Sequence, residues 1–387
     1  MQSNRASLVV LGAAALLVSA DARVVDPLLK VFGAEFRVSD QMAGWLATAY
    51  AIPYGLCQLL FGTLGDRFGK LNVLAAALLC FAVGTAACAF VPGFHVLLAL
   101  RFATGVAAAA VIPLSLSYIG DTVPLAERQI ALGRFMSSLM LGQIVAASLG
   151  GEFGESLGWR NLFLILGGAA LLATALVWRE SRRYPQTRSD RVLAWAPYQR
   201  LLQTPMAARV LGAVFVEGTF VFGSLAYLAA SMRDRFPFLS FRLIGLMLAC
   251  YGVGGILYSL AVRRLVPVLG ERGIVLLGGS VLTAACLVHA WMPMWHLFPI
   301  AMVLFGLGYV TLHGTLQTRA TELDPAARAT AVSLFAFTFF LGQGSGPLVI
   351  GALKAAGGPG VAFGTAAIGI GLLTLYVHRR VANRRPV

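Results

Sequence analysis

The stretch Gly62-Thr63-Leu64-Gly65-Asp66-Arg67-Phe68-Gly69-Lys70 is short, charged and rich in glycine, and it lies between two long apolar segments. Glycine at this density lets two helix ends approach closely around a tight turn. Asp66 and Arg67 place opposite charges at the end of an apolar segment, where ion pairs can form in one conformation and break in another. We therefore expect a gating latch between two helix ends; the alternative is an ordinary charged turn. The latch residues are Gly62, Gly65, Asp66, Arg67 and Gly69.

The surrounding chain has the composition of a membrane protein. Of its 387 residues, 58% are hydrophobic and only 12% are charged, and the mean hydropathy is +0.80. A soluble protein carries about twice that charged fraction, so lipid is the simplest cover for a core of this size. The formal net charge of +14 indicates basic loops on the cytoplasmic side of a membrane. Nucleic-acid binding is not expected, because the sequence has no patch that combines aromatic and basic residues.

Apolar runs of roughly 20 residues can cross a bilayer as helices, and the sequence contains twelve such runs. They cover residues 8–29, 41–62, 72–91, 94–118, 130–151, 160–178, 207–231, 242–262, 273–292, 296–318, 329–352 and 360–378. The one long connection, 179–206, divides them into six and six. We therefore expect an all-α membrane protein with a six-helix bundle at 1–178, a linker at 179–206 and a second six-helix bundle at 207–387.

The distribution of basic residues predicts the orientation of the chain. Most Lys and Arg residues fall on the side that carries both termini and the linker, and the positive-inside bias assigns that side to the cytoplasm. We expect a multi-pass monomer in a bacterial-type inner membrane, with both termini and the linker cytoplasmic.

The two halves repeat each other at an offset near 200 residues. Aligned pairs include Tyr50 with Tyr251, Leu64 with Leu265, Gly69 with Gly270, and Gly142-Gln143 with Gly342-Gln343. Such symmetry is expected of a transporter built from two related bundles, with its substrate site between them. In the second copy of the latch, Pro267 stands opposite the aspartate and Val268 opposite the arginine. An acidic lock is therefore expected in the N-terminal half only.

The motif Gly62-x-Leu64-x-Asp66-Arg67-x-Gly69-Lys70 resembles the loop-2/3 signature of the major facilitator superfamily of secondary transporters. Arg101-Phe102-Ala103-Thr104-Gly105 is similar to the Arg-x-x-x-Gly motif of its fourth span. The run 142–151 resembles the glycine-rich signature of the drug:proton antiporter branch, but Ala146 and Ala147 replace the usual Gly-Pro. The resemblance implies two pseudo-symmetric bundles that alternate access to a central site, and the departure weakens the assignment to the antiporter branch.

The ionisable residues within the predicted spans include Asp21, Arg23, Asp26, Arg101 and Glu217. Each costs about 2.5–3.5 kcal/mol at bilayer depth unless it has a partner or faces water. Arg23 and Asp26 can pair at i,i+3, whereas Asp21 needs a partner from another span. The family resemblance places spans 1 and 4 on the cavity, so Arg101 is that expected partner.

We expect Asp21 to couple protons by alternating between protonation and pairing with Arg101; the alternative is a static ion pair. Asp26 is a further candidate for proton coupling or an outer gate, or simply a partner for Arg23. Glu217, the lone acid of span 7, is a candidate proton or cation site or a structural carboxyl. His313 in span 10 could titrate near neutral pH or serve only in packing.

Polar and amphipathic side chains in the expected cavity-lining spans are the candidate substrate-binding residues. They would suit an amphipathic organic molecule, although each could equally pack between helices. They are Arg23, Tyr50, Tyr54, Gln58, Gln143, Tyr227, Tyr251, His313 and Gln343.

The sequence also argues against other classes of protein. It has no Gly-Lys-Ser/Thr phosphate loop, no catalytic set, and no cysteine pair with metal or redox spacing. We expect no enzyme activity, no cofactor and no metal. The predicted function is proton-coupled export of a small amphipathic compound or drug. The alternatives are proton-symport import of a sugar, nucleoside or vitamin, and a receptor-like membrane protein without flux.

Overall fold

The computed structural model describes residues 8–184, 195–324 and 328–382, so the middle of the linker lies outside the described residues. The described part is helical almost throughout and contains no strand. Its elements are α1 (Leu8–Arg23), α2 (Leu29–Phe36), α3 (Asp40–Phe68), α4 (Lys70–Ala87), the 3-10 turn η1 (Cys88–Phe90), α5 (Phe94–Ala108), α6 (Val111–Thr122), α7 (Leu125–Glu152), the π-helical turn η2 (Phe153–Leu157), α8 (Trp159–Arg183), α9 (Trp195–Leu202), α10 (Pro205–Arg235), α11 (Phe241–Trp291), α12 (Leu297–Glu322) and α13 (Arg328–Arg380).

Among the described residues, eight helical stretches are long and apolar enough to cross a bilayer, and α5 with α6 forms one of them. α11 bends at Gly270, where φ is 60°, and each of its two arms matches a predicted span. α13 bends in the same way at Gly357 and Gly358. With α1 and α3, every one of the predicted spans has a helical counterpart.

The first span differs from its expected boundaries. We expected one helix over 8–29, but α1 ends at Arg23, residues 24–28 form turns, and α2 starts at Leu29. Pro27 explains the break, because proline has no N–H to donate and its ring clashes with the preceding helical turn. The break places Asp26 in a turn instead of on a helix.

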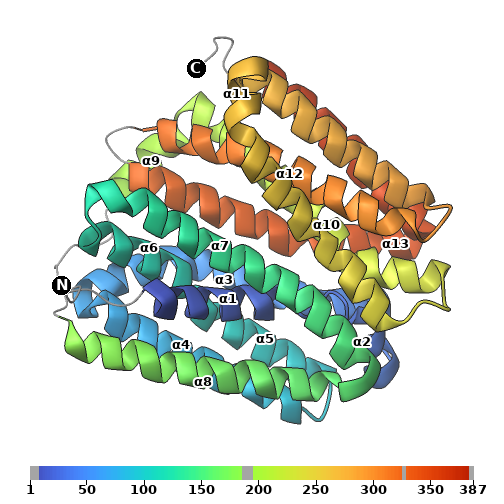
Figure 1. Ribbon diagram of the computed structural model, residues 1–387, viewed down its shortest axis with the longest axis horizontal. Helices are drawn as coiled ribbons and strands as arrows, with labels where there is room; N and C mark the ends of the chain where they lie inside the picture. The colour runs from blue at the N-terminus through green and yellow to red at the C-terminus, as the bar shows by residue number, and fades with distance from the viewer. Residues whose placement is uncertain (1–7, 185–194, 325–327, 383–387) are drawn as a thin grey trace.

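The helices form two groups that lie side by side in Figure 1, with α1–α8 in the lower part and α10–α13 in the upper part. α3 packs against α13, and α7 packs against α11, so these four helices join the two groups. α2 lies toward the right in Figure 1. We call the end of the molecule that carries α2 the outer end and the opposite end, where α3 meets α4, the inner end.

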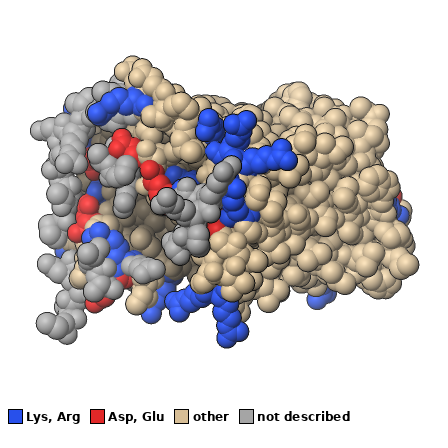
Figure 2. Space-filling view, turned by 90° about the horizontal axis from the view of Figure 1, so that it is seen from above, with Lys and Arg blue, Asp and Glu red and all other residues tan. Residues whose placement is uncertain are grey.

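Charged side chains concentrate toward the inner end of the face shown in Figure 2. Lys and Arg side chains gather over the left half of this view, whereas uncharged residues cover most of the right half. This pattern is the one expected if the inner end faces the cytoplasm, and the orientation itself stays a prediction.

Candidate functional site: a central cavity between the two groups of helices

A cavity of about 350 Å³ lies between the two groups of helices, and its size suits a small organic molecule. α1, α3, α6 and α7 line one side, and α10, α11, α12 and α13 line the other. Seven of the nine candidate substrate-binding residues are in its wall: Arg23, Tyr50, Tyr54, Gln143, Tyr251, His313 and Gln343.

Aromatic rings dominate the wall of this cavity. The rings of Tyr50 and Tyr54 stack with centroids 5.9 Å apart, and Tyr54 meets Phe340 from α13 at 4.4 Å. On the other side, Tyr309 stacks on Tyr251 at 6.1 Å. Such rings supply large apolar contact surfaces, and tyrosine adds a polar hydroxyl. The cavity can therefore hold an amphipathic ligand.

Tyr227 and Gln58 do not lie where we expected them. The Tyr227 hydroxyl donates to the carbonyl oxygens of Pro347 at 3.0 Å and Gln41 at 3.4 Å, so this side chain joins α10 to α13 and α3 near the outer end. Gln58 is buried one helical turn beyond Tyr54 and is not part of the lining. The sequence repeat could not separate these positions from the cavity wall, because it fixes the depth of a residue but not the direction of its side chain.

The expected contact between Asp21 and Arg101 is present. Arg101 Nη1 lies 2.6 Å from Asp21 Oδ2, and Arg101 Nη2 donates to the backbone oxygen of Asp21 at 2.9 Å. Both side chains are fully buried. The Arg101 guanidinium carbon lies 4.4 Å from the centroid of the Tyr50 ring, which itself lines the cavity. The pair therefore sits behind the Tyr50 ring, and its role in proton coupling stays a prediction.

A second buried cation, Arg23, is part of the cavity wall. Its Nε lies 3.4 Å from Asp26 Oδ2, and its guanidinium carbon lies 4.5 Å from the centroid of the Phe222 ring on α10. The expected pair with Asp26 thus forms across the turn after α1 and leaves the buried Nη2 without a hydrogen-bonding partner among the described residues.

Glu217 and His313 form a hydrogen-bonded pair that we did not foresee. Glu217 Oε2 lies 2.8 Å from His313 Nδ1, joining α10 to α12. Both had been singled out separately, as the lone acid of span 7 and a histidine of span 10. The repeat could have linked them, because spans 7 and 10 correspond to spans 1 and 4, which hold Asp21 and Arg101.

The latch differs from the loop that we predicted. α3 continues to Phe68 and α4 begins at Lys70, so only Gly69, with a φ of 94°, lies between the two helices. Lys70 pairs with Asp121 of α6, and its Nζ lies 3.5 Å from Asp66 Oδ1. Arg67 is exposed and forms no ion pair with another described residue. The ion pairs of this motif therefore stay within the N-terminal group of helices.

Gly62 and Gly65 lie within the last turns of α3 instead of in a loop. A Cβ at Gly65 would lie 2.3 Å from Leu114 Cδ2 of α6, so a larger residue here would require the Leu114 side chain to move. A Cβ at Gly62 would have no other atom within 4 Å, so helix packing does not require glycine at this position.

The second half of the chain carries a corresponding ion pair with its charges exchanged. Glu271 follows the Gly270 bend and pairs with Arg319 of α12, just as Lys70 follows Gly69 and pairs with Asp121. Arg319 Nη1 also lies 2.7 Å from Glu322 Oε2. We expected this copy to have decayed because the aspartate and arginine are replaced. The repeat offset could have revealed it, since Glu271 aligns with Lys70.

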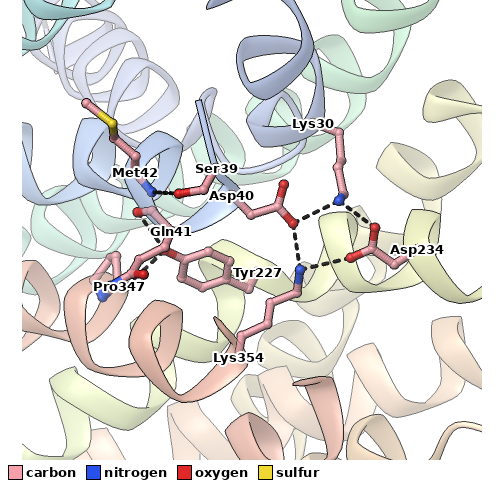
Figure 3. Close-up of polar contacts among 9 residues, drawn as sticks. All are labelled: Lys30, Ser39, Asp40, Gln41, Met42, Tyr227, Asp234, Pro347 and Lys354. Carbon is pink, nitrogen blue, oxygen red and sulfur yellow. Dashed lines mark hydrogen bonds and ion pairs between the residues drawn. The ribbon is translucent and has the colours of Figure 1, made fainter. Parts of the chain in front are cut away.

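The outer end holds a cluster of four charges that bridges the two groups of helices, which we call the outer quartet (Figure 3): Lys30, Asp40, Asp234 and Lys354. Lys30 Nζ lies 2.8 Å from Asp40 Oδ2 and also pairs with Asp234. Lys354 Nζ lies 2.6 Å from Asp40 Oδ2 and 2.8 Å from Asp234 Oδ2. Each lysine thus contacts one aspartate of its own group and one of the other.

No pattern in the sequence indicated the outer quartet. Its four residues lie at the outer ends of different spans and share no motif, so only the packing of the helices brings them together. Arg242 Nε lies 3.0 Å from Glu152 Oε2, which adds a further ion pair between α11 and α7. These contacts link the two groups of helices at the outer end.

A family model described as the Major Facilitator Superfamily matches residues 11–347. The chain belongs to this superfamily. An uncharacterized MFS-type transporter of Bacillus subtilis (strain 168) is 27% identical over 347 residues, which cover 87% of this chain and 86% of that protein. A second relative, from Helicobacter pylori (strain P12), is named a probable sugar efflux transporter. It is 26% identical over 322 residues, which cover 83% of this chain and 81% of that protein.

Solved major facilitator structures share the fold. A D-xylose-proton symporter superposes with a TM-score of 0.77 at 17% identity, covering 97% of both chains. A bacterial homologue of the lysosomal transporter Spinster, in an inward-facing and unoccupied conformation, superposes with a TM-score of 0.74 at 18% identity, covering 96% of this chain and 94% of the other. At these identities the likeness establishes the fold alone.

Close helix packing also holds the outer end of this major facilitator protein shut. A Cβ at Gly245 of α11 would lie 2.5 Å from the carbonyl oxygen of Ala147 on α7. Gly245→Val is therefore expected to hold the outer ends apart and to increase the outward-open population. Distances between spin labels at the exposed positions Ala34 and Phe238, in a variant free of native cysteines, would measure this.

Gly212→Val is the matched control for that substitution, because a Cβ at Gly212 has no atom within 4 Å. If Gly212→Val and Gly245→Val gave the same distance distribution, close packing at Gly245 would not govern the closed outer end.

The charges of the outer quartet stabilise one another. Burial alone would raise the pKa of Asp40, but hydrogen bonds and attraction to Lys30 and Lys354 outweigh it and hold that pKa below the ordinary 3.8. Burial alone would lower the pKa of Lys30, but Asp234 and Asp40 outweigh it and hold that pKa above 10.5. The quartet therefore stays charged throughout the neutral range.

This sets the expected pH dependence of the outer closure. The contribution of Asp40 is fully present above pH 3.8 and is lost as the pH falls through its lowered pKa; that of Lys30 is lost only as the pH rises above 10.5. The difference in outer-end distance between wild type and Asp40→Asn should thus stay constant from about pH 5 to 9. A difference that varied within this range would show that another group controls the contribution of the quartet.

Proposed function

We propose that this chain is a proton-coupled secondary transporter that exports a small amphipathic organic compound by alternating access. The observation that carries the proposal is the aromatic cavity between two groups of helices, with the buried Asp21–Arg101 pair directly behind its Tyr50 wall. A carboxylate at this depth is costly unless it is paired or protonated. Asp21 therefore alternates between pairing with Arg101 and holding a proton.

Export and a polar, sugar-sized compound are supported by the curated relatives. The Helicobacter pylori relative is named for sugar efflux. The cavity wall also offers amide groups for hydroxyl-bearing ligands, from Gln143, Gln317 and Gln343. Gln143 Oε1 has no hydrogen-bonding partner among the described residues. A compound with an apolar body and several hydroxyls would satisfy both the rings and the amides.

Import by proton symport is the second candidate. It is favoured by Ala146 and Ala147, which stand where the antiporter signature has Gly-Pro. The direction of net flux separates the two candidates, because both use the same cavity and the same inward proton gradient.

The test uses everted membrane vesicles that hold the full chain, with radiolabelled methyl β-D-thiogalactoside as a sugar probe and ethidium as an amphipathic probe. Export predicts that an acid-inside gradient drives accumulation of a probe and that a protonophore abolishes it. Gradient-driven depletion of a preloaded probe from the same vesicles would instead establish import. Vesicles without the protein supply the background.

A further inference from the structure

We propose that His313 and Glu217 form a second proton-binding site, which opens onto the central cavity and exchanges its proton with that cavity while the outer end is closed. This inference rests on the proposed proton coupling and assigns a second location for the proton. It concerns the C-terminal group of helices, whereas Asp21 and Arg101 belong to the N-terminal group.

The two buried pairs occupy corresponding helices but differ in chemistry. Asp21 and Arg101 join the first and fourth spans, and Glu217 and His313 join the seventh and tenth. A guanidinium does not lose its proton in a protein, whereas an imidazole titrates near neutral pH. In the C-terminal pair, both members can therefore gain or lose a proton.

The two pairs also differ in their access to the cavity. Asp21 and Arg101 are fully buried and absent from the cavity wall. The His313 side chain is 17% exposed and is part of that wall, whereas Glu217 is completely buried behind it. Gly314 and Gln317 continue the wall along α12 toward the inner end. A proton can thus reach Glu217 from the cavity through the imidazole ring.

The geometry of the pair defines the path of the proton. His313 Nδ1 lies 2.8 Å from Glu217 Oε2, which leaves Nε2 as the ring atom that takes up a proton from the cavity. When Nε2 gains a proton, the hydrogen on Nδ1 is shared with or transferred to Oε2. The pair then exists as imidazolium with carboxylate or as imidazole with carboxylic acid. Both forms carry no net charge, and loss of the proton leaves one negative charge.

The apolar surroundings of the pair make a net charge on it energetically costly. The His313 ring lies 5.2 Å from Tyr309, 4.7 Å from Phe339 and 5.5 Å from Phe335, measured between ring centroids. An unpaired charge is costly in such an apolar wall, so the neutral, proton-loaded pair is favoured when water is excluded. Water that enters the cavity reduces this cost and allows the proton to leave.

Other polar groups near the pair are few. Tyr309 lies on α12 itself, Tyr251 faces it from α11, and Arg23 lies across the cavity on α1, where it is paired with Asp26. Glu217 Oε1 has no hydrogen-bonding partner among the described residues. Because Asp26 offsets the charge of Arg23, hydration of the cavity is the change that favours loss of the proton from the pair.

The test follows the five histidines of the purified full-length protein in nanodiscs by NMR of ¹³C-labelled imidazole rings. The resonance that disappears in His313→Gln belongs to His313. We expect Glu217→Gln to move the midpoint of this resonance by at least about one pH unit, because the shared proton loses its second acceptor. His296→Gln, which changes an exposed histidine, should leave the midpoint unchanged.

An unchanged His313 midpoint in Glu217→Gln would overturn the second proton site. This readout requires neither a substrate nor flux, so it is independent of the vesicle assay. Gradient-driven flux with no coupled titration would leave the proposed function standing and remove this inference. Coupled titration without flux of any probe would support this inference and contradict the proposed function.

Discussion

Asp21→Asn is expected to abolish gradient-driven transport, with a loss of at least about a hundredfold, while exchange of labelled for unlabelled probe across the membrane continues. Exchange needs only that the cavity binds the probe and changes its accessibility. Accumulation also requires a proton on the carboxyl, which asparagine cannot hold. The measurement compares gradient-driven uptake with exchange in the same proteoliposomes.

A double variant separates proton coupling from a purely structural role of the pair. Asp21→Asn alone leaves Arg101 buried without its carboxylate, which costs about 3–5 kcal/mol and lowers thermal stability. Asp21→Asn combined with Arg101→Gln removes both charges and should recover most of that stability, but not the gradient-driven transport. Full recovery of uptake by the neutral double variant would show that the pair is a static link between α1 and α5.

Asp40→Asn is expected to open the outer end. Asp40 contacts both Lys30 and Lys354, so the substitution removes one ion pair within the N-terminal group of helices and one between the two groups. It leaves two lysines beside the single carboxylate of Asp234. Only the pair with Lys354 links the two groups, so at roughly 1 kcal/mol for a partly buried pair the outward-open population should rise about fivefold. Spin labels at Ala34 and Phe238 report this as a longer distance component.

Glu35→Gln is the matched control for this substitution. Glu35 also lies at the outer end and pairs with a basic residue, Arg160, but both residues belong to the N-terminal group of helices. Its loss should leave the distance distribution unchanged. If Glu35→Gln and Asp40→Asn had equal effects, general loss of charge at this end would explain the result, and the bridging position of Asp40 would not matter.

The ion pairs at the two ends of the molecule differ in whether a conformational change must break them. In this conformation, ion pairs link the two groups of helices at the outer end. At the inner end, Lys70 with Asp121 and Glu271 with Arg319 each stay within one group. Opening the outer end must therefore break ion pairs, whereas the inner pairs can remain intact or exchange partners when that end closes.

The sequence by itself determined the class of fold and the positions of the spans. Length and polarity of the apolar runs suffice for this, because every backbone polar group in lipid must be bonded within its own helix. The need of a buried charge for a partner, together with the family resemblance that places spans 1 and 4 on one cavity, also led to the contact between Asp21 and Arg101. The class of fold and the spans need only the position of a residue along the chain.

The tertiary structure alone decided the features that depend on how helices turn and pack. The direction of the Tyr227 side chain, the pairing of Glu217 with His313, and the meeting of Lys30, Asp40, Asp234 and Lys354 all require the rotation of each helix about its axis. Apolar runs without a polar face carry little information on that rotation, because lipid and protein neighbours are both apolar. Contacts between helices distant in sequence therefore fix it, and with it the residues that face the cavity.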